Sequence, residues 1–170
     1  MNLQSKVKLN SGAEIPVLGL GVFRSKDGEE TYNAVRWALD AGYRHIDTAA
    51  VYRNEASVGR AIEDSGIPRD QIWITTKLWN DEIRAGNEEA AFAASLERLR
   101  TDYVDFYLFH NVNETTIDRF LDPANGVAPY LIEQKRAGRI RHLGFSAHGT
   151  LDTMRRFLDA VEPELEFCQI

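Results

Sequence analysis

Residues 42–52, with the sequence GYRHIDTAAVY, decide the fold and point to the chemistry. Gly42 stands where a helix would stop, and residues 43–48 are predicted to form the next strand. That strand ends on Asp47, and Tyr52 follows in the loop just beyond it. Reactive groups at the carboxyl end of a strand are typical of α/β proteins, in which the active site lies at that edge of the sheet.

The rest of the chain extends this pattern in both directions. The start, residues 7–9 and 15–17 around the turn signal of residues 10–12, predicts a β-hairpin. Strand and helix patterns then alternate, and residues 111–125 form a longer connection with turn signals. The predicted strands are residues 18–22, 43–48, 72–77, 103–110, 140–146 and 167–170, and the predicted helices are residues 27–41, 55–65, 87–100, 127–137 and 151–161.

This alternation predicts an α/β fold in which one parallel sheet has its helices outside. Two architectures satisfy it, an open doubly wound sheet and a TIM (β/α)8 barrel. We expect a single domain over residues 1–170, containing the hairpin, five βα units and the start of a sixth strand, and therefore an incomplete barrel.

Composition narrows the range of partners. The net charge of -6 argues against nucleic acid or an anionic membrane as the main partner. Cys168 is the one cysteine, which excludes a disulfide within the chain and a cysteine-based metal site and fits a reducing cytoplasm. The sequence shows no signal peptide and no apolar run long enough to span a membrane. We expect a cytoplasmic protein without a metal site.

Two further strand ends carry reactive side chains. Lys77 ends the third predicted strand and His110 ends the fourth. A tyrosine phenol titrates near 10, so Tyr52 needs an adjacent cation to favour its ionised form, and Lys77 can supply one. Asp47 can neutralise the buried lysine, and a neutral His110 ring can donate to a carbonyl oxygen. This set suits protonation of an oxygen while hydride arrives at its carbon.

Other polar and aromatic residues favour a structural interpretation. His45, His142 and Asp105 are expected to be structural, Trp73 and Phe106 are expected to lie in the core, and Trp37 is expected to be a packing residue on its helix. Two glycine motifs also fail. Residues 19–24 lack the third glycine of a dinucleotide fingerprint, and residues 144–148 lack the second glycine of a nucleophile elbow.

Four segments resemble signatures of the aldo-keto reductases. They are residues 15–21 (IPVLGLG), residues 42–49 (GYRHIDTA) followed by Tyr52, residues 74–79 (ITTKLW) and residues 103–110 (YVDFYLFH). The resemblance covers nearly the whole chain. It implies a (β/α)8 barrel that reduces aldehydes or ketones with NADPH, although NADH also fits. It further implies that Tyr52 is the general acid, that Lys77 and Asp47 tune it, and that His110 orients the substrate carbonyl.

The resemblance also implies binding positions outside this tetrad. Asp47 and five further positions would contact the cofactor, and the substrate would lie against the side chains of Phe23, Trp79 and His110. The five are Gly21, Val22, Phe23, Ser146 and Gln169. The chain departs from the family at two places: Ala147 and His148 replace the usual asparagine after the serine, and residues 111–112 replace a common Trp-Pro.

Three functional hypotheses remain open from the sequence. The first is a nicotinamide-dependent reductase of a small carbonyl compound, or a fragment of one. The second is a truncated, inactive or binding-only barrel that acts by assembly, like the potassium-channel β subunits that share this fold, with self-association through open barrel edges. The third is an open-sheet dehydrogenase, which the missing glycine and the missing acidic partner oppose.

Overall fold

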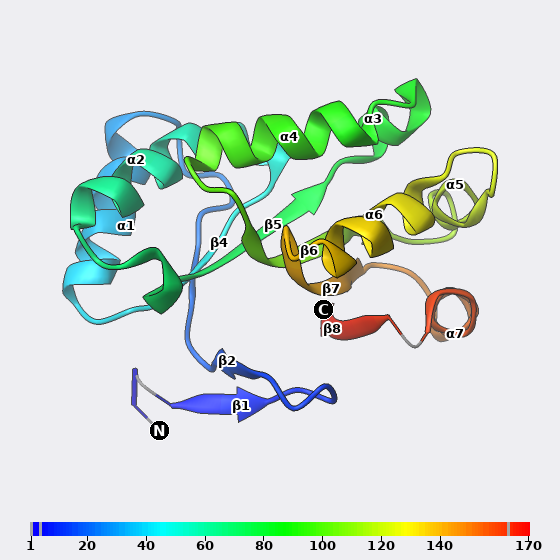
Figure 1. Ribbon diagram of the computed structural model, residues 1–170, viewed down its shortest axis with the longest axis horizontal. Coiled ribbons are helices and arrows are strands. Elements are labelled where there is room, and N and C mark those ends of the chain that lie inside the picture. The colour runs from blue at the N-terminus through cyan, green and yellow to red at the C-terminus, as the bar shows by residue number, and fades with distance from the viewer. Residues whose placement is uncertain (1, 4, 163) are drawn as a thin grey trace.

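A computed structural model describes residues 2–3, 5–162 and 164–170 of the chain (Figure 1). A six-stranded parallel sheet forms its centre, and its order β3-β4-β5-β6-β7-β8 is the order of the sequence. A doubly wound sheet reverses its strand order at a switch point, so this topology excludes the open-sheet alternative. The strands are β3 (Leu20–Gly21), β4 (His45–Asp47), β5 (Trp73–Leu78), β6 (Val104–Val112), β7 (Ile140–Ala147) and β8 (Leu165–Gln169).

The helices cover one face of this sheet, as a barrel requires (Figure 1). Parallel crossovers share one hand, so a sheet wound in a single direction keeps its helices on the same side and forms part of an incomplete barrel. The helices are α1 (Glu29–Asp40), α2 (Glu55–Ser65), α3 (Asn80–Ala85), α4 (Glu88–Leu99), α5 (Ile117–Leu121), α6 (Val127–Arg136) and α7 (Leu151–Val161), with short 3-10 turns η1 (Ala50–Tyr52) and η2 (Arg69–Gln71).

The hairpin of β1 (Lys6–Lys8) and β2 (Glu14–Pro16) lies apart from the helices, on the other side of the sheet (Figure 1). The side-chain amide of Asn10 in its turn donates to the backbone carbonyl of Leu165 at 3.3 Å and so ties the hairpin to β8. The hairpin predicted from the sequence is therefore confirmed.

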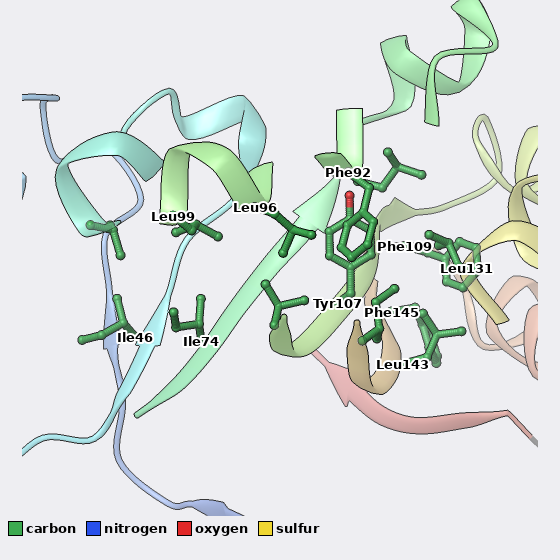
Figure 2. Packing of buried hydrophobic residues seen from close by; sticks show 14 of the residues in the cluster. Ile46, Ile74, Phe92, Leu96, Leu99, Tyr107, Phe109, Leu131, Leu143 and Phe145 are labelled. Atoms are coloured by element: carbon green, nitrogen blue, oxygen red, sulfur yellow. The ribbon is translucent and has the colours of Figure 1, made fainter. Parts of the chain in front are cut away.

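The main core lies between the sheet and the helices (Figure 2). Tyr107 and Phe109 on β6 point to this side, where Tyr107 packs edge-on against Phe92 of α4 at 4.8 Å between ring centroids. Because neighbouring side chains of a strand alternate between faces, Phe106 and His110 point the other way, into the barrel. β6 thus supplies core on one face and a polar group at the barrel mouth on the other.

The structure corrects one prediction about helices and refines another. Trp37 was expected to be a packing residue, but its side chain is 70% exposed. The buried stripe of α1 runs through Val35 and Leu39, and a residue two positions from Val35 lies about 200° round the helix. Residues 111–125 were predicted as a longer connection with turn signals, and the structure shows that this connection contains α5, which buries Ile117 and Phe120.

Strand limits also differ from the predicted ones, whereas α2 and α7 have their predicted bounds. β3 pairs over two residues only, and β6 continues past His110 to Val112 with a register shift against β7. Asn111 lies in this irregular stretch with a left-handed φ of 60°. Bulges of this kind bend a strand locally and are common beside active sites. The short helix α3 was not predicted either.

The residues interpreted as structural have the partners that this role requires. Asp105 is buried and accepts hydrogen bonds from Arg69 and Arg141. His45 is bonded to the hydroxyl of Thr75 at 2.8 Å, and the ring of His142 stacks on Phe106. None of the helices in the described part of the chain is long and apolar enough to cross a membrane.

Candidate active site

Four polar side chains converge at the carboxyl ends of neighbouring strands. Asp47 ends β4, Tyr52 ends η1 directly after it, Lys77 lies one residue before the end of β5, and His110 lies near the end of β6. Parallel pairing with consecutive strand order places these ends along one edge of the sheet. The structure therefore brings together the four residues that the sequence singled out.

Lys77 is the centre of this group. Its ammonium donates to the Asp47 Oδ1 atom at 2.7 Å and to the backbone carbonyl of Thr48 at 2.9 Å. A longer contact of 3.4 Å joins its Nζ atom to the Tyr52 hydroxyl. Burial lowers the pKa of Lys77 because it disfavours the charged form, and the Asp47 carboxylate opposes that shift. The lysine is thus held as one half of a buried ion pair.

The short turn η1 positions Tyr52. The backbone N–H of Tyr52 donates to the carbonyl of Ala49, and Arg53 ends the turn with a left-handed φ of 59°. The phenol ring packs 4.9 Å from the Phe23 ring and lies edge-on to His110 at 6.0 Å. These contacts direct the hydroxyl toward Lys77.

The pKa of the Tyr52 phenol differs from the sequence prediction. We expected the cation of Lys77 to favour the ionised form, but burial first, and the negative charge of Asp47 second, raise the pKa of Tyr52 to about 12. The Asp47 carboxylate neutralises the nearby ammonium and is itself close to the phenol. Tyr52 is therefore a neutral O–H donor at physiological pH in this structure.

His110 is neutral as well. Burial lowers its pKa to about 3, and electrostatic interactions with Lys77 and His148 add to this effect. The Nδ1 atom of His110 is buried without a hydrogen-bond partner among the described residues. Its ring lies edge-on to Trp79 at 5.2 Å, which limits its orientation. A neutral imidazole can donate one N–H to an oxygen without adding charge to the site.

A cavity of about 140 Å³ opens beside this group. It is lined by the polar residues Tyr52, Lys77, His110, Ser146, His148 and Gln169 and by Ile170. Gln169 donates from Nε2 to Asp47 Oδ2 at 3.3 Å, while its Oε1 atom is buried without a partner among the described residues. Ser146 Oγ accepts from the backbone N–H of Asn111 at 2.8 Å. Ser146 and Gln169, both expected from the sequence to contact the cofactor, therefore border the reactive group.

A second cavity, of about 370 Å³, lies on the other side of Tyr52. It is lined by Phe23, Val51, Tyr52, Trp79, His110, Asn111 and His148. All three residues expected to contact substrate, Phe23, Trp79 and His110, are among them. The aromatic wall suits the apolar part of a small organic substrate.

Two of the expected cofactor positions in the first loop, Gly21 and Val22, line neither of these two cavities. The side chain of Val22 is buried in the core between sheet and helices, so only its backbone can take part in the site. Gly21 lines a third cavity of about 560 Å³ on the inner face of the sheet, which also reaches Asp47 and Gln169.

Sequence reasoning missed Thr48 and Asn54. Thr48 contributes through its backbone carbonyl, and Asn54 contributes through side-chain hydrogen bonds to two loops. Within the described residues, no group of three or more potential metal ligands is present.

Comparison with known proteins shows which family the chain resembles in sequence. The family model of the aldo/keto reductases matches residues 17–169. The chain is 44% identical over 142 residues to the 9,11-endoperoxide prostaglandin H2 reductase of Trypanosoma cruzi, an alignment that covers 84% of this chain and 49% of that protein. It is 55% identical over 121 residues to the aldehyde reductase YPR1 of Saccharomyces cerevisiae, covering 71% of this chain and 38% of that one.

Solved structures agree with these relatives. An aldo/keto reductase from Brucella melitensis superposes with a TM-score of 0.85 at 40% identity, over 98% of this chain and 62% of that chain. A Bombyx mori aldo-keto reductase solved in complex with NADP gives 0.80 at 32% identity, over 98% and 57%. The chain spans about half the length of the curated relatives it matches. The family match, the barrel topology and the four converging side chains together show that this chain belongs to the aldo/keto reductase family.

Proposed function

We propose that this chain carries the catalytic group of an enzyme that reduces an aldehyde or ketone to an alcohol with hydride from NADPH. The observation that carries this proposal is the contact of a neutral Tyr52 phenol with the Lys77 ammonium, which is itself paired with Asp47. The general acid is therefore protonated before the reaction, and a cation already lies beside the oxygen that will lose the proton.

In the proposed reaction, Tyr52 donates its proton to the carbonyl oxygen while the carbonyl carbon accepts the hydride. The product is an alcohol, and the phenolate left on Tyr52 recovers a proton from solvent. A phenol with a pKa of about 12 is a weak acid, so the nearby ammonium matters most as the phenolate forms. Asp47 keeps Lys77 charged in a site where burial disfavours that charge.

His110 would hold the carbonyl oxygen in line with Tyr52. Because its pKa is lowered to about 3, its ring is neutral and donates a hydrogen bond rather than a proton. His110 borders both cavities beside the phenol, one polar and one aromatic. A carbonyl oxygen placed between the two would meet the phenol and the imidazole together, while its substituents face Phe23 and Trp79.

The residues of the polar cavity fit a nicotinamide carboxamide. The unpartnered Gln169 Oε1 atom is an acceptor for an amide N–H, and the Ser146 hydroxyl borders the same cavity. NADPH, when bound, supplies the hydride. The NADP complex of the Bombyx mori relative supports this choice of donor, with NADH as the alternative.

A direct test uses a fusion in which the 170-residue chain is followed by the part of the Brucella melitensis relative that lies beyond the matched region. The matched region covers 62% of that relative. The 170-residue chain alone is assayed beside the fusion. The fused polypeptide should consume NADPH only with an aldehyde or ketone present and should form one alcohol for each NADPH. Consumption without alcohol, or no reduction across a panel of aldehydes, would contradict the proposal.

A second candidate function is assembly through the open side of the sheet. The cavity of about 560 Å³ on the inner face is lined mainly by apolar residues of the hairpin and by Phe167, and β3 and β8 each pair on one side only within the described residues. Unpaired strand edges and exposed apolar surface favour association with another chain. A second copy of the chain could cover both.

A further inference from the structure

We propose that Asn54 is a positioning residue that holds two walls of the active site in place, an inference that rests on the proposed function. Asn54 is fully buried. Its Nδ2 atom donates to the backbone carbonyl of Val22 at 2.9 Å and to that of Ser25 at 3.0 Å. Its Oδ1 atom accepts from the hydroxyl of Thr48 at 2.9 Å. One amide thus links the loop after β3 to the loop after β4.

The position of Asn54 makes these contacts informative. Asn54 is the N-cap residue of α2, where an asparagine side chain ordinarily accepts from the first backbone N–H groups of the helix. Here the side chain makes no such bond. Its amide is directed away from its own helix, and both of its donor hydrogens serve the carbonyls of the β3 loop. Helix capping therefore does not explain the orientation of this side chain.

The first contact fixes the aromatic wall that carries Phe23. The Phe23 side chain is 63% exposed, so burial does little to hold it. The following residue, Arg24, has a left-handed φ of 65°, an unfavourable conformation for a non-glycine residue. The carbonyls bonded by Asn54 belong to Val22 and Ser25, which flank these two residues. Asn54 thus holds the loop that places the Phe23 ring 4.9 Å from Tyr52.

The second contact fixes the support of Lys77. Thr48 is fully buried, and its backbone carbonyl accepts from the Lys77 ammonium at 2.9 Å. Its backbone N–H donates to Thr75, and its hydroxyl donates to Asn54. The peptide that faces Lys77 is therefore held from β5 and from Asn54. A shift of Thr48 would change the distance from the ammonium to the Tyr52 hydroxyl.

These two contacts predict separate kinetic effects. Loosening the Phe23 loop weakens the wall against which substrate lies, which raises KM. Displacing the support of Lys77 weakens stabilisation of the phenolate, which lowers kcat. Misplacement of reacting groups by about 1 Å can cost up to about 10²-fold in rate. Asn54 itself lines none of the cavities that border Tyr52.

The test compares Asn54→Ser with Gln134→Ala. Serine is as good an N-cap residue as asparagine, so the start of α2 is preserved while the amide is lost. Gln134 is a buried amide on α6 that accepts from Arg139, and it borders none of the cavities at the site. Thr48→Val removes only the hydroxyl contact to Asn54. Hydrogen exchange is measured on the 170-residue chain, and kinetics on the polypeptide fused to the Brucella melitensis relative.

We expect Asn54→Ser to speed amide exchange over residues 20–26 by about tenfold or more, because two hydrogen bonds to that loop are lost. It should also raise KM and lower kcat, each by about threefold to tenfold. Thr48→Val should lower kcat with KM and the exchange of residues 20–26 unchanged. Gln134→Ala should alter neither kcat nor KM.

Unchanged exchange over residues 20–26 in Asn54→Ser would overturn the inference. So would faster exchange with both kinetic constants at wild-type values, because Asn54 would then be structural only. If Asn54→Ser fails to fold, the kinetics of Thr48→Val decide. A kcat at the wild-type value in Thr48→Val would then overturn the inference. Absence of carbonyl reduction by the wild-type polypeptide is a different result, and it rejects the proposed function itself.

Discussion

The Nζ atom of Lys77 lies 3.4 Å from the hydroxyl of Tyr52, although the two residues are 25 positions apart and belong to different elements. The shorter contact of the ammonium, at 2.7 Å, is with Asp47. Lys77 is therefore paired first with a carboxylate and only second with the phenol. Burial first, and the charge of this carboxylate second, raise the pKa of Tyr52 to about 12 even with a cation beside it.

Lys77→Met should suppress carbonyl reduction by about 10² or more, since general acid catalysis contributes about 10² to 10⁴ in rate. The loss of the ammonium leaves the phenolate unsupported, so the pKa of Tyr52 should rise further and the alkaline part of the pH–rate profile should move upward. Lys135→Met is the matched control, because Lys135 pairs with Glu166 away from the site. An unmoved profile in Lys77→Met would remove Lys77 from the mechanism.

His110 should remain neutral over the whole range from pH 5 to pH 8. Its pKa of about 3 lies below the ordinary value of 6.5, so the folded chain binds fewer protons than the unfolded chain between these pH values. Stability should therefore fall as the pH is lowered from 6.5 toward 3. NMR titration of the His110 ring checks this directly. Protonation near pH 6.5 would show that burial and Lys77 do not control this ring.

Glu114 should stabilise the fold at neutral pH and lose that effect in acid. Hydrogen bonds from the Thr150 backbone N–H and from the Thr153 hydroxyl at the start of α7 lower the pKa of Glu114 to about 2 from 4.5. The stabilisation is complete above pH 4.5 and disappears as the pH falls toward 2. Glu114→Gln should thus be less stable than wild type at pH 7 and equal to it at pH 2. Denaturant unfolding at both pH values measures the difference in stability between Glu114→Gln and wild type. Equal stability at pH 7 would show that these hydrogen bonds do not stabilise the fold.

The sequence predicted the features that depend on periodicity and on strand ends. Alternating strands and helices indicated a parallel sheet, and Asp47, Lys77 and His110 at successive strand ends lie together as expected. Barrel and doubly wound sheet share this pattern, so the strand order of the structure was needed to separate them.

Features that depend on contacts across the fold could not be predicted. The phenol of Tyr52 is half-buried beside Asp47, and no pattern in the sequence gives that burial or the resulting pKa. Trp37 is apolar but lies on the outer side of α1, away from the stripe of Val35 and Leu39. Asn54 had the features of an ordinary N-cap residue, and its contacts reach a loop about thirty positions away.

The isolated 170-residue chain should associate and should bind NADPH weakly. β3 and β8 are edge strands within the described residues, and the inner face between them is a cavity lined mainly by apolar side chains. A (β/α)8 barrel typically needs about 250 residues to close. Light scattering with a fluorescence titration by NADPH checks both expectations. A monomer that binds NADPH at micromolar concentration would contradict them and show that a closed barrel is unnecessary for binding.

Tyr52→Phe tests the central claim most directly, because it removes one hydroxyl and keeps the ring that packs against Phe23. The measurement is NADPH-dependent alcohol formation by the chain fused to the remaining part of the Brucella melitensis relative, with Tyr130→Phe on α6 as the control. We predict that Tyr52→Phe lowers kcat by about 10² or more while the control and the unfolding transition stay at wild-type values. Activity of Tyr52→Phe within tenfold of wild type would contradict the account, because Tyr52 would then not be the proton donor.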